Sequence, residues 1–182
     1  MKEPWEIHPS IWRNKTAFFT YLRGHLRLLW SRYPAKLQWK SAQLRSPPKG
    51  YTGRAKKLGT CYYCSEDFAA SHLEVDHVHQ AGVCNSWDTS HQFLKNLLDC
   101  NDNWVLACKP CHKIKSYSEA HSMTFIEAAV AKQVIEACKE KVETQLAKLR
   151  NLNYNGISNA TKRRACWQDY FEKLNKKGEN DE

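Results

Sequence analysis

The sequence predicts an α+β fold in which two short strands and a helix are held together by paired cysteines and flanked by longer helices. The cysteines form two Cys-x-x-Cys pairs, Cys61/Cys64 and Cys108/Cys111. Short apolar runs between the pairs have the length of strands, and apolar residues at steps of three and four predict helices on both sides. Four thiolates at this spacing make a closed tetrahedral zinc site, which is structural because no coordination position stays open.

The composition fits one domain of ordinary size with an appended arm, because 182 residues with 42% apolar content are enough for a core. We find no run of 18 apolar residues and no secretory signal, so we expect no membrane span and a cytoplasmic location. In that reducing compartment, paired cysteines indicate metal binding rather than disulfides. Three single cysteines are expected to be buried apolar residues, and Cys100 is an alternative metal ligand. The three are Cys84, Cys138 and Cys166.

The net charge of +9 is concentrated in the first 60 residues, which hold 13 basic and two acidic residues. A basic, aromatic-rich segment next to a nearly neutral body favours contact with a nucleic acid, because lysine and arginine neutralise phosphates and release counterions. A basic surface that serves only solubility is the alternative. The residues expected to contact phosphates are Arg23, Arg27, Arg32, Lys56, Lys57, Lys113 and Lys115.

Residues 1–45 are expected to form the basic helical segment that binds DNA. Residues 1–13 contain two prolines and no periodicity, and they predict an extended arm. Apolar spacing predicts a helix over residues 14–33, ended by Pro34, and a shorter helix over residues 35–45. Arginines at steps of four and five lie near one face of the first helix, where they either follow a phosphate backbone or are simply solvated.

Residues 46–60 are rich in Pro, Gly and Lys and predict a basic linker. The core that carries the paired cysteines is expected over residues 61–120. Within it, apolar runs predict strands at residues 73–78 and 103–108, and a helix from about 111 to 117.

A helical insertion is expected between the two strands. Residues 88–99 place four apolar side chains at helical spacing. Asp88 or Ser90 is the expected N-terminal cap, because short polar side chains accept the first exposed N–H groups of a helix.

Residues 121–176 are expected to form a pair of helices, followed by a disordered tail at residues 177–182. A capping box, Thr124-x-x-Glu127, and a long apolar stripe predict one helix over residues 124–150. Ser158 is expected to cap the second helix. Basic residues near its start form a second, smaller basic patch, and apolar ones form one face. The basic residues are Lys162, Arg163 and Arg164, and the apolar residues are Trp167, Tyr170, Phe171 and Leu174.

The segments LEVDHV, NWVLAC and CKPCHKIK, with CYYC before them, resemble the HNH endonuclease motif in its four-cysteine form. The matching stretch covers residues 61–115, under a third of the chain. The resemblance implies a ββα-metal finger held by structural Zn²⁺ on the four cysteines, and hydrolysis of DNA phosphodiester bonds. The basic segment and the helical insertion are similar to small freestanding HNH endonucleases of tailed phages, which implies a location in the host cytoplasm.

The resemblance also implies a role for each motif residue. His77 corresponds to the general base that activates water, a role that suits an imidazole near neutral pH. Asp76 and His112 correspond to the protein ligands of a catalytic divalent ion. Two protein ligands leave room for waters and the scissile phosphate, which suits Mg²⁺ or Mn²⁺.

Asn103 corresponds to the middle Asn of the motif, whose amide braces the loop that holds the catalytic histidine. Asn101 has the same chemistry two residues earlier, and the spacing to the second cysteine pair favours Asn103. His79 lies two residues after His77 on the same strand face and is a second candidate ligand or base. The remaining motif-region and helical histidines are expected on surfaces or loops: His72, His91 and His121.

Two other functions fit part of the pattern. A zinc-held DNA-binding module without catalysis would use the same basic segment and cysteines, but it leaves the Asp-His pair and His112 without a role. A zinc nucleobase deaminase would use His72-x-Glu74 with the second cysteine pair. That pattern needs a proline before the pair, where Ala107 stands, and it gives the first pair no role.

Overall fold

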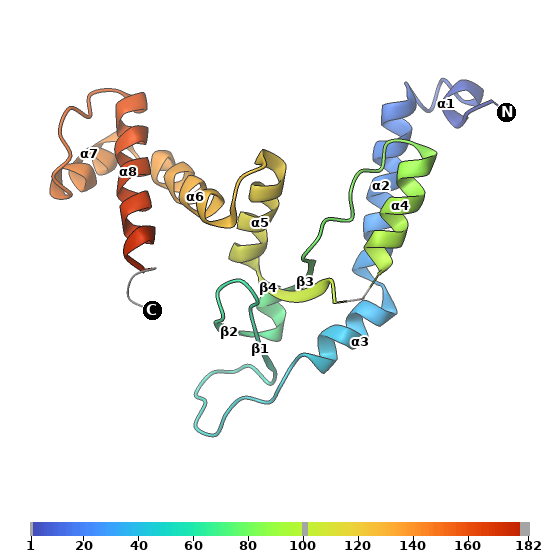
Figure 1. The fold of residues 1–182 in the computed structure, drawn as a ribbon, viewed down its shortest axis with the longest axis horizontal. Helices are drawn as coiled ribbons and strands as arrows, with labels where there is room; N and C mark the ends of the chain where they lie inside the picture. The colour runs from blue at the N-terminus through green and yellow to red at the C-terminus, as the bar shows by residue number, and fades with distance from the viewer. Residues whose placement is uncertain (1, 100–101, 179–182) are drawn as a thin grey trace. The chain divides into compact units, whose positions relative to one another are not determined.

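The fold is mixed α+β, as the sequence predicts, with helices as the main component and two small two-stranded sheets (Figure 1). The structure is a computed structural model that describes residues 2–99 and 102–178. It divides into two compact units, Met1–Lys109 and Pro110–Glu182. Among the helices described, none is both long and apolar enough to cross a membrane.

The first helix, α1 (Pro4–Ile7), lies within residues 1–13, so the prediction of an extended arm there is wrong. Glu3 and Glu6 form a capping box, in which the Glu3 N–H donates to Glu6 Oε2 at 2.9 Å. Pro4 occupies the first helical position, where an N–H would have no partner in the helix. A proline that looks like a helix breaker in the sequence therefore starts a helix here.

The next two helices confirm the predicted pair in the basic segment. Helix α2 (Lys15–Ser31) matches the helix expected over residues 14–33, and the Asn14 side chain caps it by accepting the Ala17 N–H at 2.9 Å. Helix α3 (Pro34–Ala42) has Pro34 in its first turn. Pro34 thus separates the two helices by starting the second.

Helix α4 (Trp87–Leu98) is the predicted insertion, and it lies beside α2 (Figure 1). The two helices share a core with Phe19 as its most buried residue, at 1% exposure. The other buried members are Cys84, Phe93 and Leu97. The basic N-terminal segment and the insertion are therefore packed on each other.

The N-terminal cap of α4 is Ser86, which corrects the predicted Asp88 or Ser90. Ser86 Oγ accepts the Thr89 N–H at 3.2 Å, and the Thr89 hydroxyl accepts the Ser86 N–H at 2.8 Å. Ser90 is buried instead, and its hydroxyl donates to the Ser86 carbonyl at 2.6 Å. A capping box with threonine as its second member therefore starts this helix.

The predicted linker at residues 46–60 ends in a strand, so it is not irregular throughout. Strand β1 (Leu58–Thr60) pairs antiparallel with β2 (Asp67–Ala69) around the turn of the first cysteine pair. Gly59 in β1 is closely packed, because a Cβ there would lie 2.8 Å from two leucine side chains of the second sheet and those side chains would have to move. Arg45 forms an ion pair with Asp67 and ties the end of the basic segment to this sheet.

The second sheet confirms both predicted strands. A short 3₁₀ turn, η1 (Ala70–His72), leads into β3 (Leu73–His77), which pairs antiparallel with β4 (Trp104–Cys108). The register sets His77 opposite Trp104 and Leu73 opposite Cys108. Helix α5 (Lys109–His121) follows β4 directly and is longer than the predicted 111–117.

The described residues of the second unit, up to Gly178, form three further helices, where the sequence predicts a pair. The helix predicted over residues 124–150 is two helices, α6 (Phe125–Lys139) and α7 (Val142–Asn151), which are followed by α8 (Ala160–Gly178). The expected capping box of Thr124 and Glu127 is present at the start of α6.

The break between α6 and α7 lies at Glu140 and Lys141, which both have extended backbone. The buried Gln145 amide compensates for it by donating to the Cys138 and Glu140 carbonyls at 3.1 and 2.7 Å. The turn brings the two halves of one apolar stripe into a single core with α8. The buried members are Val130, Val134, Leu149, Ile157 and Trp167.

The start and end of α8 also differ from prediction. The Asn159 side chain accepts the Lys162 N–H at 2.9 Å, so Asn159 and not Ser158 caps the helix. The helix continues to Gly178, which includes the first two residues of the predicted disordered tail. The rest of that tail lies outside the described residues, as do Cys100 and Asn101.

Candidate metal centre and active site

The four paired cysteines come together as the sequence predicts. Their Sγ atoms all lie within 4.8 Å of one another. Cys64 is exposed, and the other three are buried. Cys61 and Cys64 come from the turn between β1 and β2, Cys108 ends β4, and Cys111 lies in the first turn of α5.

The sulfur of Cys61 lies among backbone donors. It accepts the Cys108 N–H at 3.3 Å. Burial raises the pKa of the Cys61 thiol, but this N–H and those of residues 63 and 64 outweigh burial and lower the pKa to about 7. Hydrogen bonds to a thiolate favour the ionised form, which is the form that ligates metals.

The cluster fits a four-coordinate metal ion. Zinc–sulfur bonds of about 2.3 Å in a tetrahedron separate the sulfurs by about 3.8 Å, which agrees with four Sγ atoms inside 4.8 Å. The cluster could therefore bind a metal ion such as zinc. The other cysteines lie elsewhere: Cys84 is in the α2–α4 core, and Cys138 and Cys166 pack half-buried in the second unit.

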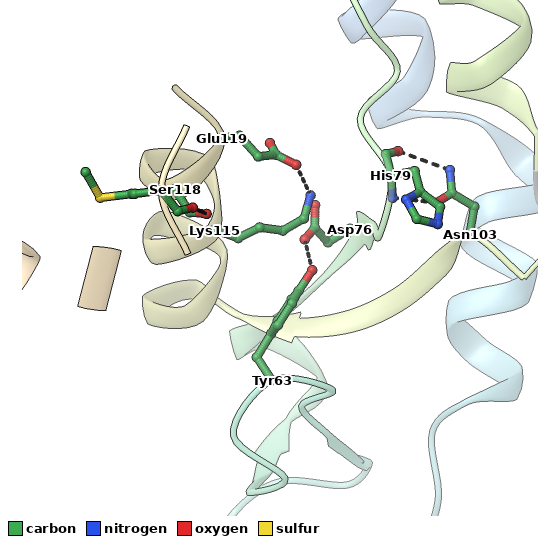
Figure 2. A network of polar contacts seen from close by, with 8 residues as sticks. Tyr63, Asp76, His79, Asn103, Lys115, Ser118 and Glu119 are labelled. Carbon is green, nitrogen blue, oxygen red and sulfur yellow. Dashed lines mark hydrogen bonds and ion pairs between the residues drawn. The ribbon is translucent and has the colours of Figure 1, made fainter. Parts of the chain in front are cut away.

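Asp76 lies in β3, and its carboxylate is held from the cysteine turn. Tyr63, between the two cysteines of the first pair, donates its hydroxyl to Asp76 Oδ2 at 2.9 Å (Figure 2). Asp76 is only 7% exposed, so this hydrogen bond orients a carboxylate that is largely removed from bulk water. The turn that carries two cysteines thus also orients a candidate catalytic side chain, which the sequence analysis did not foresee.

A ring nitrogen of His77, the last residue of β3, contacts the backbone of the inserted helix. His77 Nε2 lies 3.0 Å from the Leu97 carbonyl oxygen, near the C-terminus of α4. A carbonyl can only accept, so Nε2 carries the proton and the neutral ring has its lone pair on Nδ1. The ring is 9% exposed. His77 therefore has one defined tautomer, set by the inserted helix.

Two tryptophans pack against the His77 ring. The Trp30 ring, near the end of α2, lies 4.5 Å from it between centroids, and the Trp104 ring lies 6.4 Å from it at nearly a right angle. Trp30 and Trp104 also contact each other, with centroids 5.2 Å apart. Sequence reasoning missed Trp30 as a site residue because helical spacing assigns it to the apolar face of α2 without naming what that face covers.

Asn103 clasps the backbone just after His77. Its Oδ1 accepts the His79 N–H at 2.7 Å, and its Nδ2 donates to the His79 carbonyl at 3.2 Å (Figure 2). The Asn103 carbonyl also accepts the Val78 N–H at 2.8 Å. The amide group thus fixes the loop that leaves β3. The side chain of His79 is exposed, and its backbone is the part that the clasp uses.

The remaining motif residues lie in the first turns of α5. His112 is half-buried and follows Cys111 directly, and Lys113 is exposed. Lys115 is 9% exposed and pairs with Glu119 at 2.5 Å, one helical turn away (Figure 2). Of the two predicted phosphate contacts on this helix, Lys113 is the one that is presented to solvent.

The predicted phosphate-binding residues of the first unit are all exposed: Arg23, Arg27, Arg32, Lys56 and Lys57. Arg23 also lies over the Phe93 ring, with 5.9 Å from its guanidinium carbon to the centroid. Two further lysines were not singled out from sequence. Desolvation by burial lowers the pKa of both Lys36 and Lys40, and Lys40 donates to the Leu73 carbonyl at 2.5 Å.

Comparison of the chain with known protein families, with curated proteins and with solved structures finds no match. Function has to be inferred from the side chains themselves. Within the first unit these are the Asp76–His77 pair at the end of β3, the asparagine clasp next to it, and the tyrosine that links Asp76 to the cysteine turn.

Proposed function

We propose that the protein is a metal-dependent DNA endonuclease of the HNH type, with β3, β4 and α5 as its ββα-metal finger. The order of the elements supports this: two antiparallel strands, then a helix that begins where the second strand ends. Zinc on the four cysteines would be the structural metal, because four thiolates fill its coordination shell.

The observation that carries the proposal is the Asn103 clasp on His79. In the HNH motif the middle asparagine braces the loop that follows the catalytic histidine, and Asn103 bonds both backbone groups of the residue two positions after His77. A DNA-binding module without catalysis has no need to fix this loop. The clasp therefore favours catalysis over binding alone.

In the proposed reaction, His77 is the general base. Its Nδ1 lone pair takes a proton from a water molecule, and the water oxygen attacks the phosphorus of the scissile bond. The bond from phosphorus to the leaving oxygen then breaks. The Leu97 carbonyl continues to accept from Nε2 throughout, and it stabilises the positive charge that the ring gains.

Asp76 and His112 are the proposed protein ligands of a catalytic Mg²⁺ or Mn²⁺ ion. Such an ion, when bound, stabilises negative charge on the phosphate and on the leaving oxygen. Asp76 supplies a hard oxygen donor, and the Tyr63 hydroxyl keeps its carboxylate in one orientation. The second ligand, His112, follows Cys111 directly, so it is adjacent in sequence to a proposed ligand of the structural metal.

DNA is the proposed substrate because the basic residues are on the surface. The arginines of α2 and the lysines before β1 are exposed in the same unit as His77. Contacts of this kind bind phosphates without reading bases, so they position a duplex and do not select its sequence.

The test is to incubate a defined linear duplex with the protein and Mg²⁺, Mn²⁺ or Ni²⁺, and to sequence the ends that form. We expect hydrolysis of the strands in the presence of the metal ion, and we expect EDTA to abolish this cleavage. Binding of the duplex without any cleavage in the three metals would contradict it and favour the non-catalytic DNA-binding module.

A further inference from the structure

A second charged site lies in the second unit, away from the candidate nuclease residues in sequence. A hollow of about 430 Å³ is bounded by one face of α7, the loop at residues 154–158 and the first turn of α8. Two arginines line it, Arg150 from α7 and Arg163 from α8. The residues that line it include no aspartate or glutamate.

Arg163 is a buried cation with weak partners. It is 8% exposed, and its Nη1 lies 3.5 Å from the Ile157 carbonyl and 3.5 Å from the Ser158 carbonyl, at the outer limit of a hydrogen bond. Its Nε is buried and has no hydrogen-bond partner within the described part of the chain. A guanidinium has five N–H donors, so most of its capacity is unused.

The surroundings of Arg163 add positive charge. Arg150 lines the same hollow and is exposed, and α8, a helix of 19 residues, has the positive end of its dipole at its first turn. Asp169, a carboxylate further along α8, is already engaged by the Tyr154 hydroxyl and by Lys173, both at 2.6 Å. A buried cation is normally paired, because desolvation penalises the charge.

We infer that this hollow is a phosphate-binding site, with Arg163 as its central ligand and Arg150 as its second. A phosphate oxygen would accept from the terminal N–H groups of the guanidinium, because Nε itself is buried, and the planar fork can bind two oxygens at once. The group bound is either free phosphate or a phosphodiester of a nucleic acid, since both present the same oxygens. The inference stands apart from the nuclease, because none of its residues belongs to that site.

The test follows the Arg163 side chain directly. The Nε–Hε signal of Arg163 is recorded by NMR in the full-length protein, in titrations with inorganic phosphate and with a short oligonucleotide that has no terminal phosphate. We expect a saturable shift in at least one titration. A shift with phosphate alone identifies a free-phosphate site, and a shift with the oligonucleotide identifies a backbone site. No saturable shift in either titration overturns the inference.

Variants distinguish an arginine that binds phosphate from one that only stabilises the fold. Inorganic phosphate should raise the melting temperature of the wild type and of the control Arg164→Gln, whose side chain is exposed on the same helix. The rise should disappear in Arg163→Met and shrink in Arg150→Gln, which keeps the buried core unchanged. If Arg150→Gln and Arg163→Met are stabilised as much as the wild type, the inference is wrong. Should Arg163→Met fail to fold, Arg150→Gln decides by the same criterion.

Discussion

His77 donates from Nε2 to the backbone carbonyl of Leu97 at 3.0 Å, so a helix inserted between the two motif strands sets the tautomer of the candidate base. Helix α4 in turn packs on α2, whose Trp30 lies against the same ring. The insertion and the N-terminal segment therefore both contact the candidate base. They hold the imidazole with its lone pair on Nδ1, which is what a general base requires.

Replacing Trp30 should lower cleavage without unfolding the protein. In Trp30→Ala the His77 ring loses one of its two tryptophan neighbours and the ring orientation loosens, so we expect a fall in the cleavage rate of about 10- to 100-fold. Trp30→Phe keeps an aromatic ring at this position and should recover most of the rate. Single-turnover cleavage, with circular dichroism as the folding control, measures this. Equal rates for the three proteins would show that Trp30 only fills the core.

Removing the asparagine clasp should affect cleavage more than binding. Asn103→Ala loses both hydrogen bonds to the His79 backbone, and we expect the cleavage rate to fall by about 100-fold because the loop after His77 is no longer fixed. Asn103→Asp keeps an acceptor for the His79 N–H and should give an intermediate rate. DNA affinity, measured without added Mg²⁺ or Mn²⁺, should stay within about twofold. A parallel loss of affinity would mean that the loop itself contacts DNA.

The four-cysteine cluster should contain one zinc ion per chain and depend on it for folding. Cys61→Ser should lose the metal and unfold the first unit, since structural zinc contributes about 10 kcal/mol or more to folding in small sites. Cys166→Ser, outside the cluster, should keep both metal and fold. Elemental analysis and thermal denaturation with and without a strong chelator measure this. Zinc retained in Cys61→Ser would contradict the assignment.

The basic surface of α2 should control DNA affinity through salt-dependent phosphate contacts. Arg27→Gln and Arg32→Gln should each weaken binding to unrelated sequences by similar factors and reduce the slope of log K against log salt by about one. Lys139→Gln is the control, because Lys139 is exposed in the second unit and pairs with Glu136. Titrations at several salt concentrations measure the slopes. An unchanged slope in the α2 variants would mean that these arginines are only solvated.

The parts of the fold that the sequence predicts well are those with strong local signals. The β3 and β4 strands and the helix at residues 14–33 follow from apolar spacing, and the cysteine cluster follows from two short repeats. The errors occur where local signals are weak or ambiguous. Strands of three residues, such as β1 and β2, have too few positions for a period, and the break at Glu140 interrupts a stripe that stays apolar on both sides.

The contacts that define the candidate site depend on tertiary structure. Tyr63 meets Asp76 because the cysteine turn folds next to β3, and no spacing rule in the sequence encodes that hydrogen bond. The partner of His77 is a backbone carbonyl, which every residue has, so no residue type at position 97 could indicate it. The motif predicts which residues matter, and the packing of α2 and α4 decides how His77 is held.

The most direct test of the central claim is the rate of DNA cleavage by His77→Ala, compared with the wild type and with His91→Ala, an exposed histidine on α4. All three proteins should contain the same amount of zinc and bind DNA alike without added Mg²⁺ or Mn²⁺. We predict that cleavage with Mg²⁺ or Mn²⁺ is lost in His77→Ala and is unchanged in His91→Ala. Cleavage by His77→Ala at the rate of the wild type would contradict the role of His77 as the general base.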